Sequence, residues 1–406
     1  MRVPLASSGL RAQDIAAAIA TLESGNLTMG TKVKEFETAM ANYLGTDYFV
    51  MMNSGSSANL AIFEALMRPS KNSPHLSIGD AVLVPAIAWP TTIWPIVQLG
   101  LHPVFVDVEP GTIAIDLVQA QKIIESSRHK IKAIFPIHPL GYAIENEILN
   151  NFVRKNQLIL INDVCESLGS WRNGRHAGTG GLASSFSFYF SHHITTMEGG
   201  GVATNSIEFA DDLRAIRSHG WSRDRSDVND WTSNVSQTDS KFLFVTTGFN
   251  IRPMEIQAAI GILQIADIDS FIEKRRSVAK KINNAILGGH LEIIDGGTLS
   301  QADKEESHSW MLIGLRIKAN GNGPCRQEIL NKLQNAGIET RPILTGNFLA
   351  QPAMDRIDGN HPPASSFPVA NEISEFCFMV GAHHDLTNEQ IEYLAKSLGE
   401  ISHEIY

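Results

Sequence analysis

Apolar residues in the middle of the chain follow two alternating patterns. Short uninterrupted apolar runs alternate with stretches that repeat apolar residues at helical spacing. The runs lie at 82–84, 104–106, 133–135 and 158–161, and the helical stretches at 91–99, 116–126 and 144–156. Continuous apolar strands joined by helices are typical of a mostly parallel sheet that is covered on both faces. The pattern therefore predicts an α/β fold, in which sites gather at the carboxyl ends of the strands.

The flanking regions extend this architecture. Upstream, the spacing predicts helices carrying Ile15 to Leu22 and Val33 to Met40, a strand at 49–52 and a helix carrying Leu60 to Met67. Downstream, an amphipathic helix over 267–287, a strand over 311–317 and a helix over 326–336 indicate a smaller α+β layer. We therefore expect a large domain with an N-terminal arm at 1–266 and a small domain at 267–406.

The stretch from Ala183 to Thr204 reads ASSFSFYFSHHITTMEGGGVAT and combines a strand pattern with reactive side chains. Its phenylalanines alternate with serines, which predicts a strand that ends at the adjacent pair His192 and His193. The glycine run that follows marks a place where the backbone bends or approaches another group closely. Histidine can transfer protons near neutral pH, although two adjacent histidines on their own are more often structural.

Composition and charge narrow the class of protein. Of 406 residues, 43% are hydrophobic and 19% are charged, as in an ordinary globular protein. The formal net charge of −10 argues against nonspecific binding of nucleic acid, so an anionic nucleotide substrate would need a local basic patch. No signal-peptide pattern opens the chain and no apolar run reaches the length of a membrane span. We therefore expect a cytoplasmic protein with no membrane partner.

Four residues could contribute to a binding site, and each has a plainer alternative. Gly55 and Ser56 open a predicted helix, where they could offer amides and a hydroxyl to a phosphate or simply cap the helix. Trp89 follows a predicted strand and could stack on a ring or belong to the core. Asp163 ends another predicted strand and could pair with a protonated nitrogen or cap the next turn.

The motif from Ser187 to Ser191 and the segment SHHITTMEGG resemble the active-site strand of the pyridoxal-phosphate sugar aminotransferase family (DegT/DnrJ/EryC1/StrS). The resemblance covers essentially the whole chain, from Pro4–Ser8 to Val380–Gly381. It implies a fold-type I enzyme similar to aspartate aminotransferase, with pyridoxal or pyridoxamine phosphate as the cofactor. It also implies a homodimer with shared active sites that acts on a nucleotide sugar, with no nucleic-acid partner.

The resemblance assigns roles to particular residues. The cofactor phosphate is expected at Gly55, Ser56, Ser187 and, from the neighbouring subunit, Asn250, with Trp89 stacked on the pyridine ring and Asp163 at its nitrogen. From the residues alone, Asn250 is a turn residue.

Substrate contacts are expected at Arg223, Glu339 and Arg341. Arg341 could hold a phosphate or carboxylate through two parallel hydrogen bonds, but a structural ion pair is an equal alternative. The polar stretch from Arg223 to Ser240 is interpreted as an exposed loop, a lid or a subunit contact.

One departure from the family pattern changes the expected chemistry. His192 stands where the family has the lysine that binds the cofactor covalently, and no lysine occurs between Lys155 and Lys241. Histidine at this position resembles the family's 3-dehydratases, which make 3-deoxysugars such as those of lipopolysaccharide. It implies a cofactor that is not covalently attached and His192 as the catalytic base. The implied reaction removes the C3 hydroxyl of a nucleotide-linked 4-keto-6-deoxyhexose, with GDP-4-keto-6-deoxymannose favoured and glutamate reloading the cofactor with its amino group.

The cysteines bear on the type of elimination. Cys165, Cys325 and Cys377 are too scattered for a metal motif or a disulfide framework. Related dehydrases that transfer electrons hold an iron–sulfur cluster on four cysteines, so we expect no such cluster and no metal. Two alternatives stay open: a nucleotide-sugar aminotransferase that leaves the amine in its product, and an inactive homologue with a binding or regulatory role.

Overall fold

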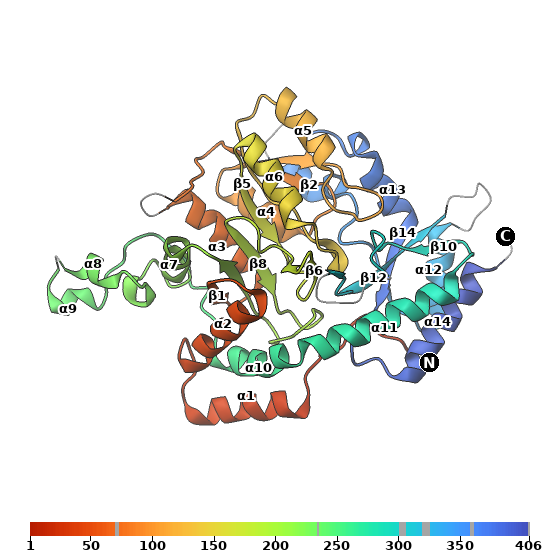
Figure 1. Cartoon of the computed structure of the whole chain (residues 1–406), viewed down its shortest axis with the longest axis horizontal. Helices are drawn as coiled ribbons and strands as arrows, with labels where there is room; N and C mark the ends of the chain where they lie inside the picture. Colours follow the sequence, from red (N-terminus) through yellow and green to blue (C-terminus); the bar gives the residue numbers. More distant parts are fainter. Residues whose placement is uncertain (70–72, 234, 300–305, 319–324, 358–360, 405–406) are drawn as a thin grey trace.

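The central sheet organises the molecule (Figure 1). The computed structural model describes residues 1–69, 73–233, 235–299, 306–318, 325–357 and 361–404. Seven strands lie in the order β1-β9-β8-β5-β4-β2-β3. They are β1 Tyr48–Met52, β2 Ala81–Pro85, β3 His102–Val106, β4 Ile131–Ile134, β5 Ile159–Asp163, β8 Ala183–Ser187 and β9 Gly200–Thr204. β9 is antiparallel to β1 and β8, and the pairs from β8 to β3 are parallel, so the predicted mostly parallel α/β sheet is confirmed.

Helices cover both faces of this sheet because successive strand residues point to opposite sides. Val82 and Val84 of β2 share a cluster of buried side chains with α3 (Gly55–Met67), α4 (Pro90–Gln98) and α7 (Ile207–Ile216). Leu83 between them belongs to a different cluster, which it shares with α5 (Leu117–Ser126) and α6 (Asn146–Asn156). Burial on both faces explains why the strand sequences are uninterrupted apolar runs.

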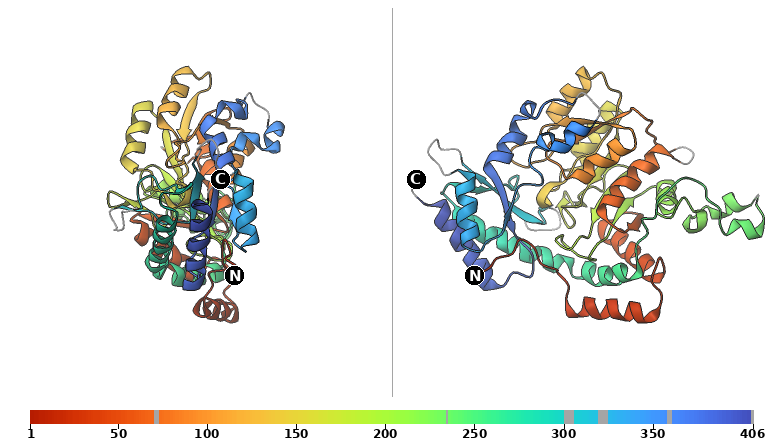
Figure 2. Two further views of the ribbon diagram at one scale, coloured as in Figure 1. Left: turned by 90° about the vertical axis from the view of Figure 1, so that its right-hand side faces the viewer. Right: turned by 180° about the vertical axis from the view of Figure 1, so that it is seen from behind.

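The N-terminal helices lie along one edge of the molecule (Figure 2). α1 (Ala12–Ser24) and α2 (Thr31–Leu44) both pack against α10 (Glu255–Ala266). The predicted apolar row of α1 faces away from the chain's own core, since Ile15, Ile19 and Leu22 are 49–55% exposed. The row is therefore available to another surface.

A second, smaller sheet lies in the C-terminal part. Its strands follow the order β10-β12-β14-β13. They are β10 Leu291–Ile293, β12 Leu312–Ile317, β13 Thr340–Arg341 and β14 Cys377–Gly381, accompanied by α11 Ile268–Ile286, α12 Arg326–Asn335, α13 Pro368–Phe376 and α14 Asn388–Ser402. A separate cluster of buried side chains joins α11, β12 and α14, and it includes Val3 from the N-terminal segment. The layer contains the predicted strands and helices, and the division at residue 266 stays a prediction.

The remaining elements are short. A small sheet comprises β6 Trp171–Arg172, β7 Arg175–His176 and β11 Glu306–Ser307, and two short helices are α8 Val228–Thr232 and α9 Gln237–Ser240. Short 3₁₀ helices occur at Pro139–Gly141, Ser222–Asp224, Phe348–Ala350, Pro352–Arg356 and Ala364–Ser366. The stretch interpreted as an exposed loop contains α8 and α9, and it projects from the body of the molecule (Figure 1).

The predicted strand through the alternating phenylalanines is too long. β8 ends at Ser187, and Phe188 is buried whereas Phe190 is 41% exposed. The chain folds back after the strand because the amide of Phe188 donates to the carbonyl of Gly199 at 2.9 Å and its carbonyl accepts from Thr196 at 2.9 Å. The two histidines therefore lie on a closed loop, residues 188–199, beyond the end of the strand.

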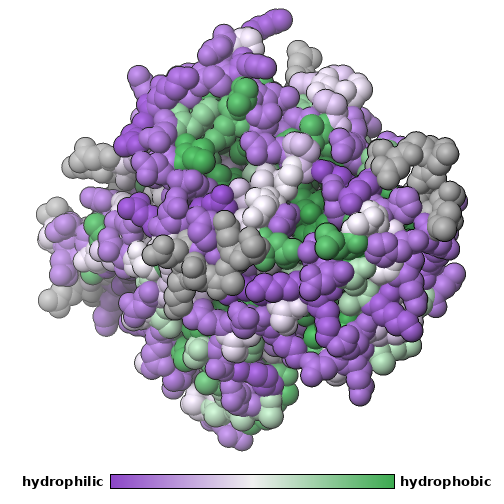
Figure 3. All heavy atoms as spheres, turned by 45° about the vertical axis from the view of Figure 1, so that its right-hand side comes forward, coloured by the Kyte–Doolittle hydropathy of each residue, from purple (hydrophilic) through white to green (hydrophobic). Residues whose placement is uncertain are grey.

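The described part of the chain contains no helix long and apolar enough to cross a membrane. Hydrophilic side chains dominate the face that Figure 3 displays, with hydrophobic patches between them.

Candidate active site

His192 is held with one ring nitrogen free to accept a proton. Its Nδ1 lies 2.6 Å from the carbonyl oxygen of Cys165, and because a carbonyl can only accept, Nδ1 carries the hydrogen. Nε2 of the neutral ring then keeps its lone pair. Burial lowers the pKa of His192 to about 4, the Cys165 carbonyl opposes this shift, and the positive charges of Arg275 and Arg341 add to it. The imidazole is therefore neutral near pH 7 and can act as a base at Nε2.

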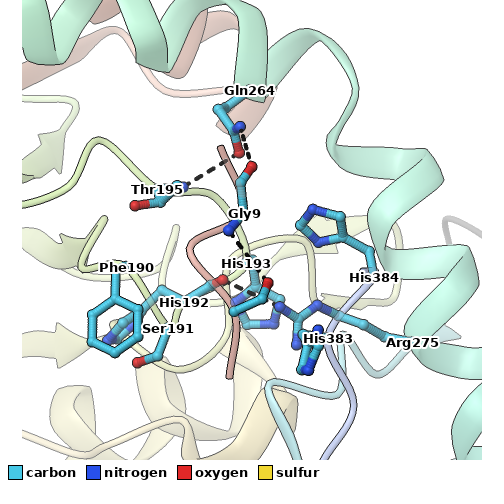
Figure 4. A pocket seen from close by; sticks show the side chains of 11 residues that line it. Gly9, Phe190, Ser191, His192, His193, Thr195, Gln264, Arg275, His383 and His384 are labelled. Atoms are coloured by element: carbon cyan, nitrogen blue, oxygen red, sulfur yellow. Dashed lines mark hydrogen bonds between the residues drawn. The ribbon is translucent and has the colours of Figure 1, made fainter. Parts of the chain in front are cut away.

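The two adjacent histidines differ in their surroundings. Both line a small cavity behind the loop (Figure 4). His193 is fully buried, and burial lowers its pKa well below the ordinary value, with the charges of Arg275 and His192 adding to the shift. His192 is only partly buried. Of the pair, His192 is the one that a substrate can approach.

The start of α3 meets the end of β8 in a contact that requires glycine. A Cβ added to Gly55 would lie 2.5 Å from the Cβ of Ser187, and one added to Gly200 would lie 2.4 Å from the amide nitrogen of Gly55. The cap of α3 is Ser54, whose hydroxyl accepts a backbone hydrogen bond within the helix. Across the described residues, the amides of Gly55 and Ser56 have no acceptor. Free amides at a helix N-terminus beside a serine hydroxyl can bind a phosphate.

Asp163 presents a fixed carboxylate at the carboxyl end of β5. It is 4% exposed. Its Oδ2 accepts from Nδ2 of Asn59 at 3.1 Å and from Oγ1 of Thr92 at 2.8 Å, so α3 and α4 both hold it. Its Oδ1 accepts from the amide of Cys165 at 3.1 Å. The carboxylate thus caps the next turn, as one alternative predicted, while side chains of two helices fix its orientation.

Trp89 and Arg341 come together from distant parts of the chain. Trp89 is 44% exposed, so the alternative that placed it in the core is wrong. The guanidinium carbon of Arg341 lies 5.9 Å from the centre of the Trp89 ring. No carboxylate within the described ranges forms an ion pair with Arg341, although its charge acts on both His192 and Glu166. Arg341 thus brings a positive charge close to Trp89 and His192.

Glu166 belongs to the same neighbourhood and was not predicted from the sequence. It is buried, and its Oε2 accepts from the amide of Leu140 at 2.9 Å. Burial raises the pKa of Glu166 to about 7, the Leu140 amide and Arg341 oppose the shift, and the negative charge of Asp163 adds to it. A carboxyl group that titrates near neutrality close to Asp163 and Arg341 is typical of active sites. The only sequence signal for it is its place three residues after Asp163.

The raised pKa of Glu166 makes a prediction about stability. Between about pH 4.5 and pH 7 the folded chain keeps a proton that the unfolded chain loses, so this group's contribution falls as the pH rises. Glutamine mimics the protonated form, so we expect Glu166→Gln to be about 3 kcal/mol more stable than the native protein at about pH 8. At about pH 4.5 the difference should vanish.

Denaturant unfolding at both pH values measures this difference. The exposed Glu125→Gln serves as the matched control, and its stability should follow that of the native protein. A difference for Glu166→Gln that does not change with pH would contradict the raised pKa.

Within one chain, the contacts of three predicted site residues are with groups other than His192. Asn250 is exposed, and its Oδ1 accepts from Nε of Arg252 at 3.0 Å. The guanidinium carbon of Arg223 lies 4.9 Å from the centre of the Trp221 ring. Glu339 accepts from Nη2 of Arg2 at 2.7 Å and from the amide of Leu5 at 3.1 Å, which ties it to the N-terminal segment. The roles of these residues stay predictions.

Comparisons with known proteins agree with this arrangement. A model of the family described as "DegT/DnrJ/EryC1/StrS aminotransferase family" matches residues 9–399. The chain belongs to this family. The GDP-4-keto-6-deoxy-D-mannose 3-dehydratase of Yersinia pseudotuberculosis is 38% identical over 393 residues, which are 96% of each chain. The protein of the same name from Escherichia coli O55:H7 is 38% identical over 348 residues, 85% of this chain and 86% of the other.

Solved structures give the same result. The E. coli GDP-4-keto-6-deoxy-D-mannose-3-dehydratase with bound hydrated pyridoxal phosphate superposes with a TM-score of 0.87 at 34% identity, covering 98% of this chain and 99% of the other. A mutant of that enzyme type, with histidine replaced by asparagine and GDP-perosamine bound, also has a TM-score of 0.87 at 34% identity, covering 98% and 100%. The fold-type I architecture predicted from the sequence is confirmed by these matches.

The residues present fit pyridoxal phosphate. The glycine-only contact of Gly55 with Ser187 places free amides and a hydroxyl where a phosphate can bind. Asp163 supplies a fixed carboxylate for a ring nitrogen, and the exposed face of Trp89 is available for stacking. His192 supplies a base and no amine.

Proposed function

We propose that this protein is a pyridoxal-phosphate-dependent 3-dehydratase of deoxysugar and lipopolysaccharide biosynthesis. Its substrate would be a nucleotide-linked 4-keto-6-deoxyhexose, namely GDP-4-keto-6-deoxymannose, the substrate in the names of the similar proteins. One observation carries the proposal: the position of the family's lysine holds His192, whose Nδ1 is bound to the Cys165 carbonyl and whose Nε2 has no partner among the described residues. A base that cannot bind the cofactor covalently suits elimination better than a cycle in which the cofactor returns to a covalent link with lysine.

The chemistry divides between the cofactor and the protein. When bound, pyridoxamine phosphate supplies the amine that activates the C4 ketone and a ring that accepts an electron pair. Gly55, Ser56 and Ser187 would hold the phosphate, and Asp163 would keep the ring nitrogen protonated. Nε2 of His192 would take up the proton that is removed during the reaction. It would then donate this proton to the departing C3 hydroxyl, which leaves as water.

The electrons and atoms of the cycle balance with glutamate as the amino donor. Glutamate would be oxidised to its keto acid as C3 of the sugar is reduced from an alcohol carbon to a methylene. The C3 oxygen of the sugar would leave as water, and a water molecule would supply the keto oxygen of the acid formed from glutamate. The amino group of glutamate would leave as ammonia. Both half-reactions require one base, the role assigned to His192.

We propose that no iron–sulfur cluster takes part. Burial raises the pKa of the Cys165 thiol well above its ordinary value and that of Cys377 to about 11, so both thiols stay protonated. In the described part of the chain, no group of three or more His, Cys, Asp or Glu side chains is arranged so that it could hold a metal ion. Two electrons from glutamate suffice for the net reaction.

We further propose a homodimer in the cytoplasm with active sites shared between subunits. The apolar row of α1 is exposed, and so are Phe242 and Phe244, which follow α9, at 68% and 53%. Apolar surface of this kind favours contact with another copy of the chain. Asn250 would then reach the cofactor phosphate of the partner subunit, and Arg223 could reach its nucleotide.

A non-covalent cofactor leads to a prediction. Borohydride fixes a cofactor that is linked through a lysine, but here His192 replaces that lysine. We therefore expect the mass of the polypeptide to be unchanged after treatment of the protein loaded with pyridoxal phosphate. Intact-protein mass spectrometry measures it, with a lysine-containing member of the family as the positive control. A stable adduct on any lysine would contradict the prediction.

The proposed function is tested by the mass of the sugar product. The purified protein is incubated with pyridoxal phosphate, glutamate and a panel of nucleotide 4-keto-6-deoxysugars that differ in base and in sugar stereochemistry. We expect a product with one oxygen fewer and no added nitrogen, formed most rapidly from the GDP-linked mannose derivative. A product that retains the amine would establish the aminotransferase alternative, and no product with any sugar would favour the binding or regulatory one.

A further inference from the structure

Arg275 of α11 is a buried cation that reaches the loop of His192. It is 1% exposed and lines the cavity behind that loop, as Figure 4 shows. Its Nη2 donates to the carbonyl of His192 at 3.1 Å. Its Nη1 donates to the carbonyls of Trp310 at 3.2 Å and Met311 at 2.7 Å. One guanidinium therefore connects three backbone carbonyls from two distant segments.

Arg275 occupies an environment that is unfavourable for a charge. Among the residues that the structure describes, no carboxylate lies within salt-bridge distance of it. Burial lowers the pKa of Arg275 to about 10, and the negative charge of Asp385 only partly compensates. A buried cation without an acidic partner is costly, and an apolar side chain of similar volume would often stabilise the fold better. Its presence here points to a role besides stability.

We infer that Arg275 is a positioning residue for His192. The imidazole is held at Nδ1 by the Cys165 carbonyl, and its own backbone carbonyl is held by Arg275. Together these bonds fix the direction of Nε2 relative to the end of β8. The planar guanidinium suits this task because it donates to several carbonyls at once, whereas an ammonium group is a point charge on a flexible stem.

The charge of Arg275 has a second effect on His192. The charged and titratable groups around the imidazole come from several elements: Arg275 from α11, Arg341 from β13, and Tyr189 and His193 from the same loop. His383, His384 and Asp385 face Arg275 from the segment after β14. A nearby cation disfavours the protonated ring, so Arg275 helps to keep His192 in its basic form.

The test compares Arg275→Met, Arg275→Lys and the control Lys280→Met, which removes an exposed cation from the same helix. The first readout is the pKa of His192 in the full-length protein, from NMR of labelled histidines assigned by comparison with His192→Asn. The second is kcat and KM for glutamate in the conversion of pyridoxal phosphate to pyridoxamine phosphate. The second readout rests on the proposed function, whereas the first does not.

For Arg275→Met we expect the pKa of His192 to rise by about one unit, since one nearby charge is lost. The acid limb of the plot of kcat against pH should move to higher pH by the same amount. Loss of the hydrogen bonds from Arg275 to the three carbonyls should also lower kcat at its optimum pH by about 10-fold or more, with KM for glutamate nearly unchanged. Arg275→Lys keeps the charge but cannot bridge the three carbonyls, so it should lose kcat with little change in the pKa of His192.

A folded Arg275→Met protein with the native pKa of His192 and native kcat would overturn the inference. If that variant fails to fold, unchanged kcat in Arg275→Lys would overturn it. A shifted pKa of His192 in Arg275→Met together with full activity of His192→Asn would instead contradict the proposed function. The inference that Arg275 positions His192 would then still stand.

Discussion

Replacement of His192 by asparagine is expected to slow the conversion of pyridoxal phosphate to pyridoxamine phosphate with glutamate by about 10²–10⁴-fold, which is the usual contribution of a positioned general base. Asparagine approximates the shape of imidazole and can still donate to the Cys165 carbonyl, but it cannot take up a proton. Dehydration of the sugar should be lost to a similar extent because it needs the same base. Absorbance of the cofactor in single-turnover experiments measures the first rate, and the mass of the sugar product measures the second.

Cofactor affinity should hardly change in His192→Asn. The proposed phosphate contacts at Gly55 and Ser187, the Asp163 carboxylate and the Trp89 face do not involve the imidazole. The exposed His403→Asn is the matched control and should retain the native rates. Turnover of glutamate by His192→Asn at the native rate would show that His193 or another group is the base.

Replacement of His192 by lysine is expected to change the outcome of the reaction. The introduced amine stands where the family's lysine attaches the cofactor, so borohydride should now add the cofactor mass to the polypeptide. Exchange of amino groups with glutamate can recover because lysine is also a base. Dehydration should stay poor, since the cofactor is drawn back to the covalently held state after each exchange.

Three measurements follow this variant: intact-protein mass after borohydride, the rate with glutamate and the mass of the sugar product. The native protein provides the reference for each. Dehydration by His192→Lys at the native rate would contradict the account, because it would show that the covalent link between the cofactor and the lysine does not slow elimination.

The sheet could be predicted from the sequence, and so could the residues proposed for the cofactor site, because both depend on local patterns. Strands such as β2 are buried on both faces, so they appear as apolar runs whichever helices cover them. Gly55 begins helix α3 and Asp163 ends strand β5. Strand ends and helix starts converge at one edge of a parallel sheet. The family resemblance then supplied roles that the residues alone left open.

The missed features depend on contacts between distant segments. The alternation of Phe186, Phe188 and Phe190 predicts a longer strand, but the hydrogen bond from Phe188 to Gly199 folds the chain back earlier. The pKa of Glu166 is raised by burial among neighbours that its own sequence does not reveal. Arg275 binds backbone carbonyls, and carbonyl partners have no sequence signature.

The most direct test of the central claim is a mass balance with glutamate labelled with heavy nitrogen. The native protein is incubated with pyridoxal phosphate, the labelled glutamate and GDP-4-keto-6-deoxymannose, and both the nucleotide sugar and the released ammonia are analysed by mass spectrometry. The account predicts a sugar with one oxygen fewer and no heavy nitrogen, and one labelled ammonia for each sugar converted. Heavy nitrogen retained in the sugar, with its oxygen at C3 still present, would contradict it.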